Sequence, residues 1–187
     1  ISAYFVNPNL YVLFMLNMTK LALKYGNSPA MAYVYGSYGF ILGSGFGDYQ
    51  KGYEYGQFSS RMNDRFQSHQ YRSKSYFSFG VFVTPWVKPL PESLELIKES
   101  FRSGIEDGDL VFAGYALTYQ VLVKDFQGIA LDEMNEDLAA NYRILEQTNH
   151  HDTLLMLEML RNVIMNVEGK TTNPVLIGED EAEEEHF

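Results

Sequence analysis

Residues 28–66 read SPAMAYVYGSYGFILGSGFGDYQKGYEYGQFSSRMNDRF, and this stretch decides the fold. Ser28 followed by Pro29 favours a helix start. A serine side chain can accept a hydrogen bond from a free N–H group of the first turn, and a proline at the first helical position loses no hydrogen bond. Gly47 and Asp48 predict the end of this helix and the start of a second one, with Asp48 as the N-cap. The stretch therefore predicts a helical hairpin.

Glycine recurs at a regular spacing inside this hairpin. A glycine within a helix costs about 1 kcal/mol relative to alanine, so these glycines require an offsetting gain. Close approach of two helix backbones supplies one, with tyrosine rings filling the space around the seam. The candidate helix-packing glycines are Gly39, Gly43, Gly52 and Gly56. We reject a membrane-spanning glycine zipper, because the segment is rich in Tyr, Ser and Gly and poor in Leu and Ile.

Length and composition fit one ordinary folded domain. The chain has 187 residues, of which 46% are hydrophobic and 20% are charged. It contains no cysteine, which excludes disulfides, thiol catalysis and cysteine metal sites. No signal peptide or membrane-spanning run is visible, so we expect a cytoplasmic protein without membrane insertion. The first residue is Ile1 rather than Met, and we expect an excised piece of a longer chain.

The charge of the chain is concentrated near its C-terminus. The net charge is −10, and residues 179–185 carry six of the acidic side chains. This acidic tail reads as a solvated end or linker. Lysine and arginine form no cluster, so we expect no nucleic-acid partner.

Cap, proline and glycine signals divide the chain into eight helices with short links and no strand. Asn7 followed by Pro8 repeats the cap-plus-proline start and predicts the first of them. Pro85 lies in the last turn of the fourth helix and is expected to end it early. The expected helices cover 8–25, 29–46, 48–66, 68–87, 89–106, 109–126, 130–147 and 152–168.

The helices recur with a period of about 40 residues, which is typical of helical repeat proteins. Tyr38, Phe79 and Tyr119 follow one another at nearly equal steps on the first helix of each pair. On the partner helices, Tyr49, Leu90 and Leu131 follow one another at equal steps. A helix pair that recurs in this way predicts an all-α, right-handed α-solenoid of tetratricopeptide-like pairs, with a unit longer than the roughly 34 residues of the standard repeat. We expect a repeat domain over residues 1–168, cut from a longer array, and a linker with the acidic tail over residues 169–187.

The aligned aromatic residues have two interpretations. Tyr38, Phe79 and Tyr119 either pack in the core between the helices or line a binding groove, and we favour the core. Whether they line the groove is left open by the sequence.

No cluster of polar residues in the sequence has the pattern of a catalytic or metal site. His150, His151 and Asp152 fit a polar turn between helices, with Asp152 as a cap. Glu133, Glu136 and Asp137 fit a solvated helix face, since a carboxylate metal site needs Glu-x-x-His pairs on facing helices. Residues 169–172, GKTT, lack the upstream glycine and the preceding strand of a phosphate loop. We therefore assign no catalytic, cofactor-binding or metal-binding residue.

Four stretches resemble a known family: residues 9–27 (NLYVLFMLNMTKLALKYGN), Gly47-Asp48-Tyr49 with residues 52–57 (GYEYGQ), residues 108–116 (GDLVFAGYA), and residues 169–179 (GKTTNPVLIGE). They are similar to a helical repeat region of large bacterial hybrid serine/threonine kinase–ATPase–sensor histidine kinases. In that family the repeats lie between the kinase and ATPase domains and the sensor and histidine kinase domains. The family's kinase loop, phosphate loop and phospho-acceptor histidine have no counterpart here, so its catalytic residues are assigned to no position.

The resemblance implies a non-catalytic scaffold or sensor segment of a multidomain signalling kinase. Its partners would be proteins or peptides, including flanking domains of the same chain, and the sequence leaves the oligomeric state open. A first alternative is a regulatory solenoid that binds a short peptide in its groove. A second is a helical metal-carboxylate enzyme, for which the required ligand motif is missing.

Overall fold

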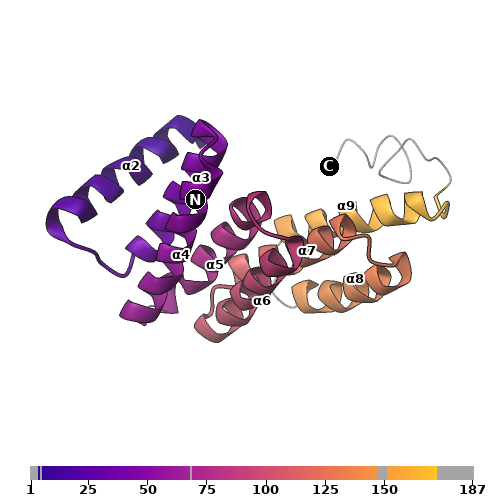
Figure 1. Ribbon diagram of the computed structural model, residues 1–187. Helices are drawn as coiled ribbons and strands as arrows, with labels where there is room; N and C mark the ends of the chain where they lie inside the picture. Colours follow the sequence, from indigo (N-terminus) through magenta and orange to yellow (C-terminus); the bar gives the residue numbers. More distant parts are fainter. Residues whose placement is uncertain (1–3, 5, 68, 147–150, 172–187) are drawn as a thin grey trace. The chain divides into compact units, whose positions relative to one another are not determined.

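The computed structural model describes residues 4, 6–67, 69–146 and 151–171. These stretches form eight α-helices and one 3₁₀ helix and contain no strand, as the sequence predicted for the fold class. The helices are α2 (Pro8–Tyr25), α3 (Met31–Phe46), α4 (Tyr49–Phe66), α5 (His69–Phe82), η1 (Thr84–Trp86), α6 (Leu90–Asp107), α7 (Leu110–Phe126), α8 (Leu131–Glu146) and α9 (His151–Val167) (Figure 1). In the described part of the chain, none of the helices combines the length and the apolar character that crossing a membrane requires.

Two of the predicted helix starts are confirmed in atomic detail. Asn7 Oδ1 accepts a hydrogen bond from the Leu10 N–H (3.2 Å), at the start of α2. Asp48 Oδ1 accepts one from the Lys51 N–H (3.2 Å), at the start of α4. Each side chain satisfies an N–H group of the first turn that has no partner within its helix.

Two of the predicted caps are wrong, and one helix ends early as expected. Ser28 does not cap α3, because residues 29–30 form a turn and the helix begins at Met31. α5 ends at Phe82 and is followed by η1, which agrees with the early end expected from Pro85, because this residue has no N–H group to continue an α-helix. Asp152 lies one residue inside α9 rather than before it.

The helix starts are evenly spaced along the chain. α2, α4, α6 and α8 begin at Pro8, Tyr49, Leu90 and Leu131, and the interval between successive starts is constant. This interval, the distance in sequence from Pro8 to Tyr49, is the repeat step. α5, α7 and α9 begin at His69, Leu110 and His151, which are separated by the same repeat step.

One buried hydrogen bond recurs in the same register. Ser59 Oγ donates to the Ala32 carbonyl oxygen, and Ser100 Oγ donates to the Ser73 carbonyl oxygen. Donor and acceptor are each shifted by one repeat step between the two bonds. The contact between α3 and α4 is therefore equivalent to the contact between α5 and α6.

The chain divides into two compact units, Ile1–Ala113 and Gly114–Phe187. In the first unit α3 packs against α4 and α5 packs against α6, while α3 also contacts α2 and α5. The centre of the α2–α4 part is a cluster of buried side chains that includes Tyr11, Met15, Val34 and Met62. Apolar burial of this kind supplies the main stabilisation of the packed helices.

α2 differs from the other helices of the first unit, because most of its apolar side chains remain exposed. Leu13, Phe14, Leu21 and Leu23 expose 53%, 49%, 54% and 78% of their surface. An apolar surface of this extent is typical of a site that other protein segments contact.

The second unit comprises the rest of α7 from Gly114, then α8 and α9. α8 lies alongside α9 (Figure 1). Asn141 Nδ2 of α8 donates to the Leu117 carbonyl oxygen of α7 (3.3 Å). Met134 of α8 and Leu157 and Ile164 of α9 are buried.

Candidate functional site

Gly39 of α3 and Gly52 of α4 lie where these two helices approach each other most closely. A methyl group on Gly39 would lie 2.5 Å from the Gly52 carbonyl oxygen, and one on Gly52 would lie 2.6 Å from the Gly39 carbonyl oxygen. Near the turn, a methyl group on Gly43 would lie 3.0 Å from the Tyr49 ring. Any larger side chain at Gly39 or Gly52 would meet backbone atoms, which cannot move aside as a side chain can.

Gly56 of α4 makes room for an aromatic ring of α5. A methyl group on Gly56 would lie 2.1 Å from Cδ2 of Phe79. The Phe79 side chain is 4% exposed, and its ring centroid is 5.3 Å from that of Tyr53. The seam between α4 and α5 is therefore filled by a phenylalanine ring above a glycine.

The other two aromatic residues singled out in the sequence are half-buried. The Tyr38 ring packs edge-on against Tyr55, with centroids 4.7 Å apart, and also borders a pocket of about 400 Å³ with Leu16 and Leu23. Tyr119 lies in α7. One repeat step after Phe79 lies Gln120, so these two residues hold equivalent positions. Tyr119 lies one residue before this position and is therefore not the equivalent of Phe79.

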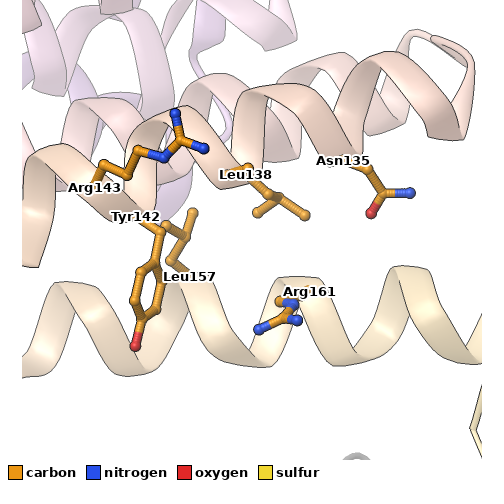
Figure 2. A pocket seen from close by; sticks show the side chains of 7 residues that line it. Asn135, Leu138, Tyr142, Arg143, Leu157 and Arg161 are labelled. Atoms are coloured by element: carbon orange, nitrogen blue, oxygen red, sulfur yellow. The ribbon is translucent and has the colours of Figure 1, made fainter.

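A second pocket, of about 400 Å³, lies between α8 and α9 in the second unit. Figure 2 shows Leu138 and Asn135 pointing from α8 toward α9, with Arg161 on the facing helix. Leu138 and Leu157 are buried and form an apolar floor, while Arg143 and Arg161 are exposed at the rim. The lining residues are Asn135, Leu138, Ala139, Tyr142, Arg143, Leu157 and Arg161.

This pocket occupies the same place in the helix register as the filled seam of the first unit. Leu138 follows Gly56 by two repeat steps, and Arg161 follows Phe79 by two repeat steps. A buried ring at this position of α5 is thus replaced by an exposed guanidinium in α9. The exchange leaves a pocket with a positive rim where the first unit has an apolar contact.

The carboxylate of Glu168 near this pocket interacts with Asn135 and Lys170 and with neither of the two arginines. Asn135 Nδ2 donates to Glu168 Oε1 (2.9 Å), and Glu168 Oε2 pairs with Lys170 Nζ (2.9 Å). Within the described residues, neither Arg143 nor Arg161 takes part in an ion pair or a hydrogen bond. A guanidinium without a carboxylate beside it can bind an anionic group through two parallel hydrogen bonds.

The carboxylates expected on a solvated face are partly engaged. Lys124 Nζ of α7 donates to Asp137 Oδ2 (2.5 Å) and lies 3.6 Å from Glu133 Oε1. The hydrogen bond from Lys124 to Asp137 raises the pKa of this lysine, and the two negative charges raise it further. Lys124 is therefore paired, unlike the arginines of the pocket.

The remaining polar candidates form no visible reactive centre. Over the described stretches, no three or more His, Asp or Glu side chains come together as metal ligands would. His151 and Asp152 lie in the first turn of α9, whereas His150 lies outside the described residues. In the GKTT segment, Thr172 and the acidic tail that follows also lie outside them.

Sequence reasoning missed the pocket between α8 and α9. Arg143 and Arg161 lie on different helices and belong to no motif. Extending the register of Tyr38 and Phe79 by two further repeat steps reaches Gln120 and then Arg161. A charged residue at a repeat position that elsewhere carries an aromatic ring was the signal that could have revealed the site.

The sequence is similar to that of a curated protein, the "Hybrid signal transduction histidine kinase G" of Dictyostelium discoideum. The two are 24% identical over 176 residues, which cover 92% of this chain and 5% of that protein. The chain therefore spans a small part of the relative that it matches. The resemblance found in the sequence named bacterial hybrid kinases, and this relative is also a hybrid histidine kinase. No family model and no solved structure matches the chain.

Proposed function

We propose that this chain is a non-catalytic helical repeat segment of a signal-transduction kinase, in which it holds protein segments together. The constant repeat step of the helices and the equivalent serine hydrogen bonds support a repeat of helix pairs, and for this repeat we propose the right-handed α-solenoid of tetratricopeptide-like pairs. The similarity to a hybrid histidine kinase supports the signalling context. Its partners are proteins or flanking domains of the parent chain, in the cytoplasm.

The apolar surface of α2 carries the proposal. Phe14, Met18 and Leu21 expose 49%, 36% and 54% of their surface. One repeat step later, the equivalent residues of α4 are Tyr55, Ser59 and Met62.

Those three residues of α4 face α3. Tyr55 packs against the Tyr38 ring, Ser59 donates to the Ala32 carbonyl oxygen, and Met62 lies in the cluster shared with α3. The face of α2 that a preceding first helix would cover is thus uncovered in the described residues. This face is built to accept a further helix.

The proposal is tested with the variant Phe14→Ser/Leu21→Ser and with Met15→Ser as the matched control. Phe14 and Leu21 are exposed, so we expect the double variant to keep its melting temperature and to lose concentration-dependent association or binding of a hydrophobic dye. Met15 is 8% exposed, so its replacement should lower the melting temperature. If the double variant is destabilised as much as the control, the face is not a binding surface.

Native mass spectrometry of the purified wild-type chain separates this proposal from the enzyme alternative. A spectrum of protein species alone, as monomer or oligomer, agrees with a scaffold. A metal ion bound in stoichiometric amount would contradict it and favour a metal-carboxylate enzyme.

The pocket between α8 and α9 favours one further candidate function, a regulatory solenoid that binds a peptide. In this case the ligand would bind at a defined pocket, with saturation at one peptide per chain. The two functions are compatible, because the α2 surface and the pocket belong to different units of the chain.

A further inference from the structure

We propose that the pocket between α8 and α9 binds an acidic peptide segment of a partner protein. Arg143 and Arg161 hold carboxylates of the peptide, and Ala139 and Tyr142 contact an adjacent apolar side chain. This inference rests on the proposed function of the chain as an interaction segment and assigns a site and a ligand class to it.

The shape of the pocket follows from a change at a packing position. In the first unit the Phe79 ring lies so close to Gly56 that a methyl group there would be 2.1 Å from it. The equivalent pair in the second unit is Leu138 and Arg161, and about 400 Å³ remains open beside it. A buried aromatic position that carries an exposed arginine no longer serves the packing of the helices.

The arginines of the pocket are distinguished from the other arginines of the chain by their lack of a partner. Arg72 and Arg102 bind Glu99, at 2.7 and 2.5 Å. Arg61 and Arg65 lie over the rings of Phe58 and Phe66.

Among the described residues, Arg143 and Arg161 form no ion pair and no cation–π contact, although the Tyr142 ring lines the same pocket. In a chain of net charge −10, two arginines without a carboxylate beside one pocket favour an anionic ligand.

The lining of the pocket favours a peptide over a small inorganic anion. Leu138 and Leu157 are almost fully buried and close the base of the pocket. The apolar surface that a ligand can reach belongs to the exposed Ala139 and the half-buried Tyr142. Asn135 uses its Nδ2 for Glu168, which leaves its Oδ1 to accept from a peptide N–H group. The apolar lining, the amide acceptor and the two guanidinium groups on separate helices together match an extended segment with acidic and apolar side chains.

The test uses a fluorescein-labelled peptide, GEDEAEEEHF, which repeats residues 178–187 of the chain. Its control is GQNQAQQQHF, in which amides replace the carboxylates. The host is the whole chain of residues 1–187 with the same amides at its six acidic positions in 179–185, so that its own copy of the sequence does not compete. Fluorescence anisotropy should show saturable 1:1 binding of the acidic peptide and none of the amide peptide.

Variants of the host locate the site. Arg143→Ala and Arg161→Ala should each raise the Kd about tenfold, because each removes a charge-assisted contact. Arg61→Ala is the matched control, since Arg61 precedes Arg143 by two repeat steps and holds the equivalent position of α4. It should change the Kd less than about twofold. Circular dichroism of each variant verifies that the helices are retained.

Four results would overturn the inference. The first is that the acidic peptide does not bind, and the second is that the amide peptide binds equally well. The third is that Arg61→Ala loses as much affinity as the two pocket variants. The fourth is that inorganic phosphate displaces the labelled peptide as effectively as unlabelled peptide does at equal ionic strength. The last result would make the pocket a simple anion site. None of them affects the outcome of the α2 experiment, so the two proposals fail separately.

The wild-type chain adds one more comparison. If it binds the labelled peptide much more weakly than the host does, its own residues 179–185 occupy the pocket. That result would replace the partner protein by the chain itself and would overturn the intermolecular part of the inference. Equal affinity of the two chains supports a separate partner.

Discussion

The seam between α4 and α5 and the seam between α8 and α9 occupy equivalent places in the helix register but differ in content. In the first, a buried Phe79 ring lies above Gly56; in the second, an exposed Arg161 lies near Leu138 and a pocket remains. The comparison shows that one helical framework can use the same position for packing in one unit and for a surface pocket in another. A repeat position whose side chain is not needed for core packing can carry a residue that binds a ligand.

The largest expected effect comes from removing the ring that fills the first seam. Phe79→Ala should lower the free energy of unfolding by about 3–5 kcal/mol, because it leaves a cavity at a buried site. The equivalent change Arg161→Ala should alter it by less than about 0.5 kcal/mol, since this side chain is exposed. Urea denaturation followed by circular dichroism measures both values. Equal losses in the two variants would refute the contrast between the seams.

The next effect tests how closely the first seam is packed. Gly56→Ala places a methyl group against the Phe79 ring and should destabilise the chain by about 1–3 kcal/mol. Gly45→Ala is the control, because Gly45 lies in α3 with no atom near enough to contact a methyl group. It should stabilise the chain by up to about 1 kcal/mol through helix propensity. Thermal denaturation of both variants decides the question; stabilisation by Gly56→Ala would mean that the seam is loose.

A smaller change in stability is expected at Gln67, which ends α4 and lies one repeat step from the glycines that end α2 and α6. Gln67 has φ 46° and is the non-glycine residue with positive φ in the described stretches. Gly108, one repeat step after it, has φ 76° and shares its left-handed conformation, whereas Gly26, one repeat step before it, has φ 98° with ψ 168° and lies outside that conformation. Gln67→Gly should therefore stabilise the chain by about 1 kcal/mol, whereas Gly108→Ala should destabilise it by a similar amount. Melting temperatures that move in the opposite directions would contradict the equivalence of these turns.

The smallest effect concerns the paired lysine of the second unit. Asp137 raises the pKa of Lys124, so the pair stabilises the folded state below the unfolded-state pKa, which is about 10.4. This contribution, at most about 1 kcal/mol, is lost as the pH rises through the higher pKa of the folded state. The difference in stability between wild type and Lys124→Met should accordingly shrink above about pH 10.4. A difference that stays constant from pH 8 to 12 would rule out the pair as its cause.

Helix positions were predictable because their signals act over a few residues. Asn7 and Asp48 cap the helices that the sequence assigned to them. Leu90 and Leu131 begin helices at the repeat step that the sequence predicted. The cap assigned to Ser28 was wrong, since a turn intervenes before Met31, and local sequence signals rarely place a boundary to the residue.

The chemistry of the pocket was not predictable in the same way. Arg143 looks like any exposed arginine of a polar helix face, and so does Arg161. Whether these arginines can bind a ligand depends on which helix lies opposite and on whether a carboxylate lies close enough to pair with them. Both are properties of packing between segments that no local pattern encodes.

For the residues that the structure describes, the sequence by itself determined the all-α class, the helices and their repeat step, because caps, prolines and glycines act on the backbone within one or two turns. Only the tertiary structure decided that Phe79 is buried while Tyr38 in the same register is half-buried, and that Arg143 and Arg161 border one pocket. The physical reason is that burial and charge pairing depend on the neighbours that packing supplies, and those neighbours lie far away in the sequence.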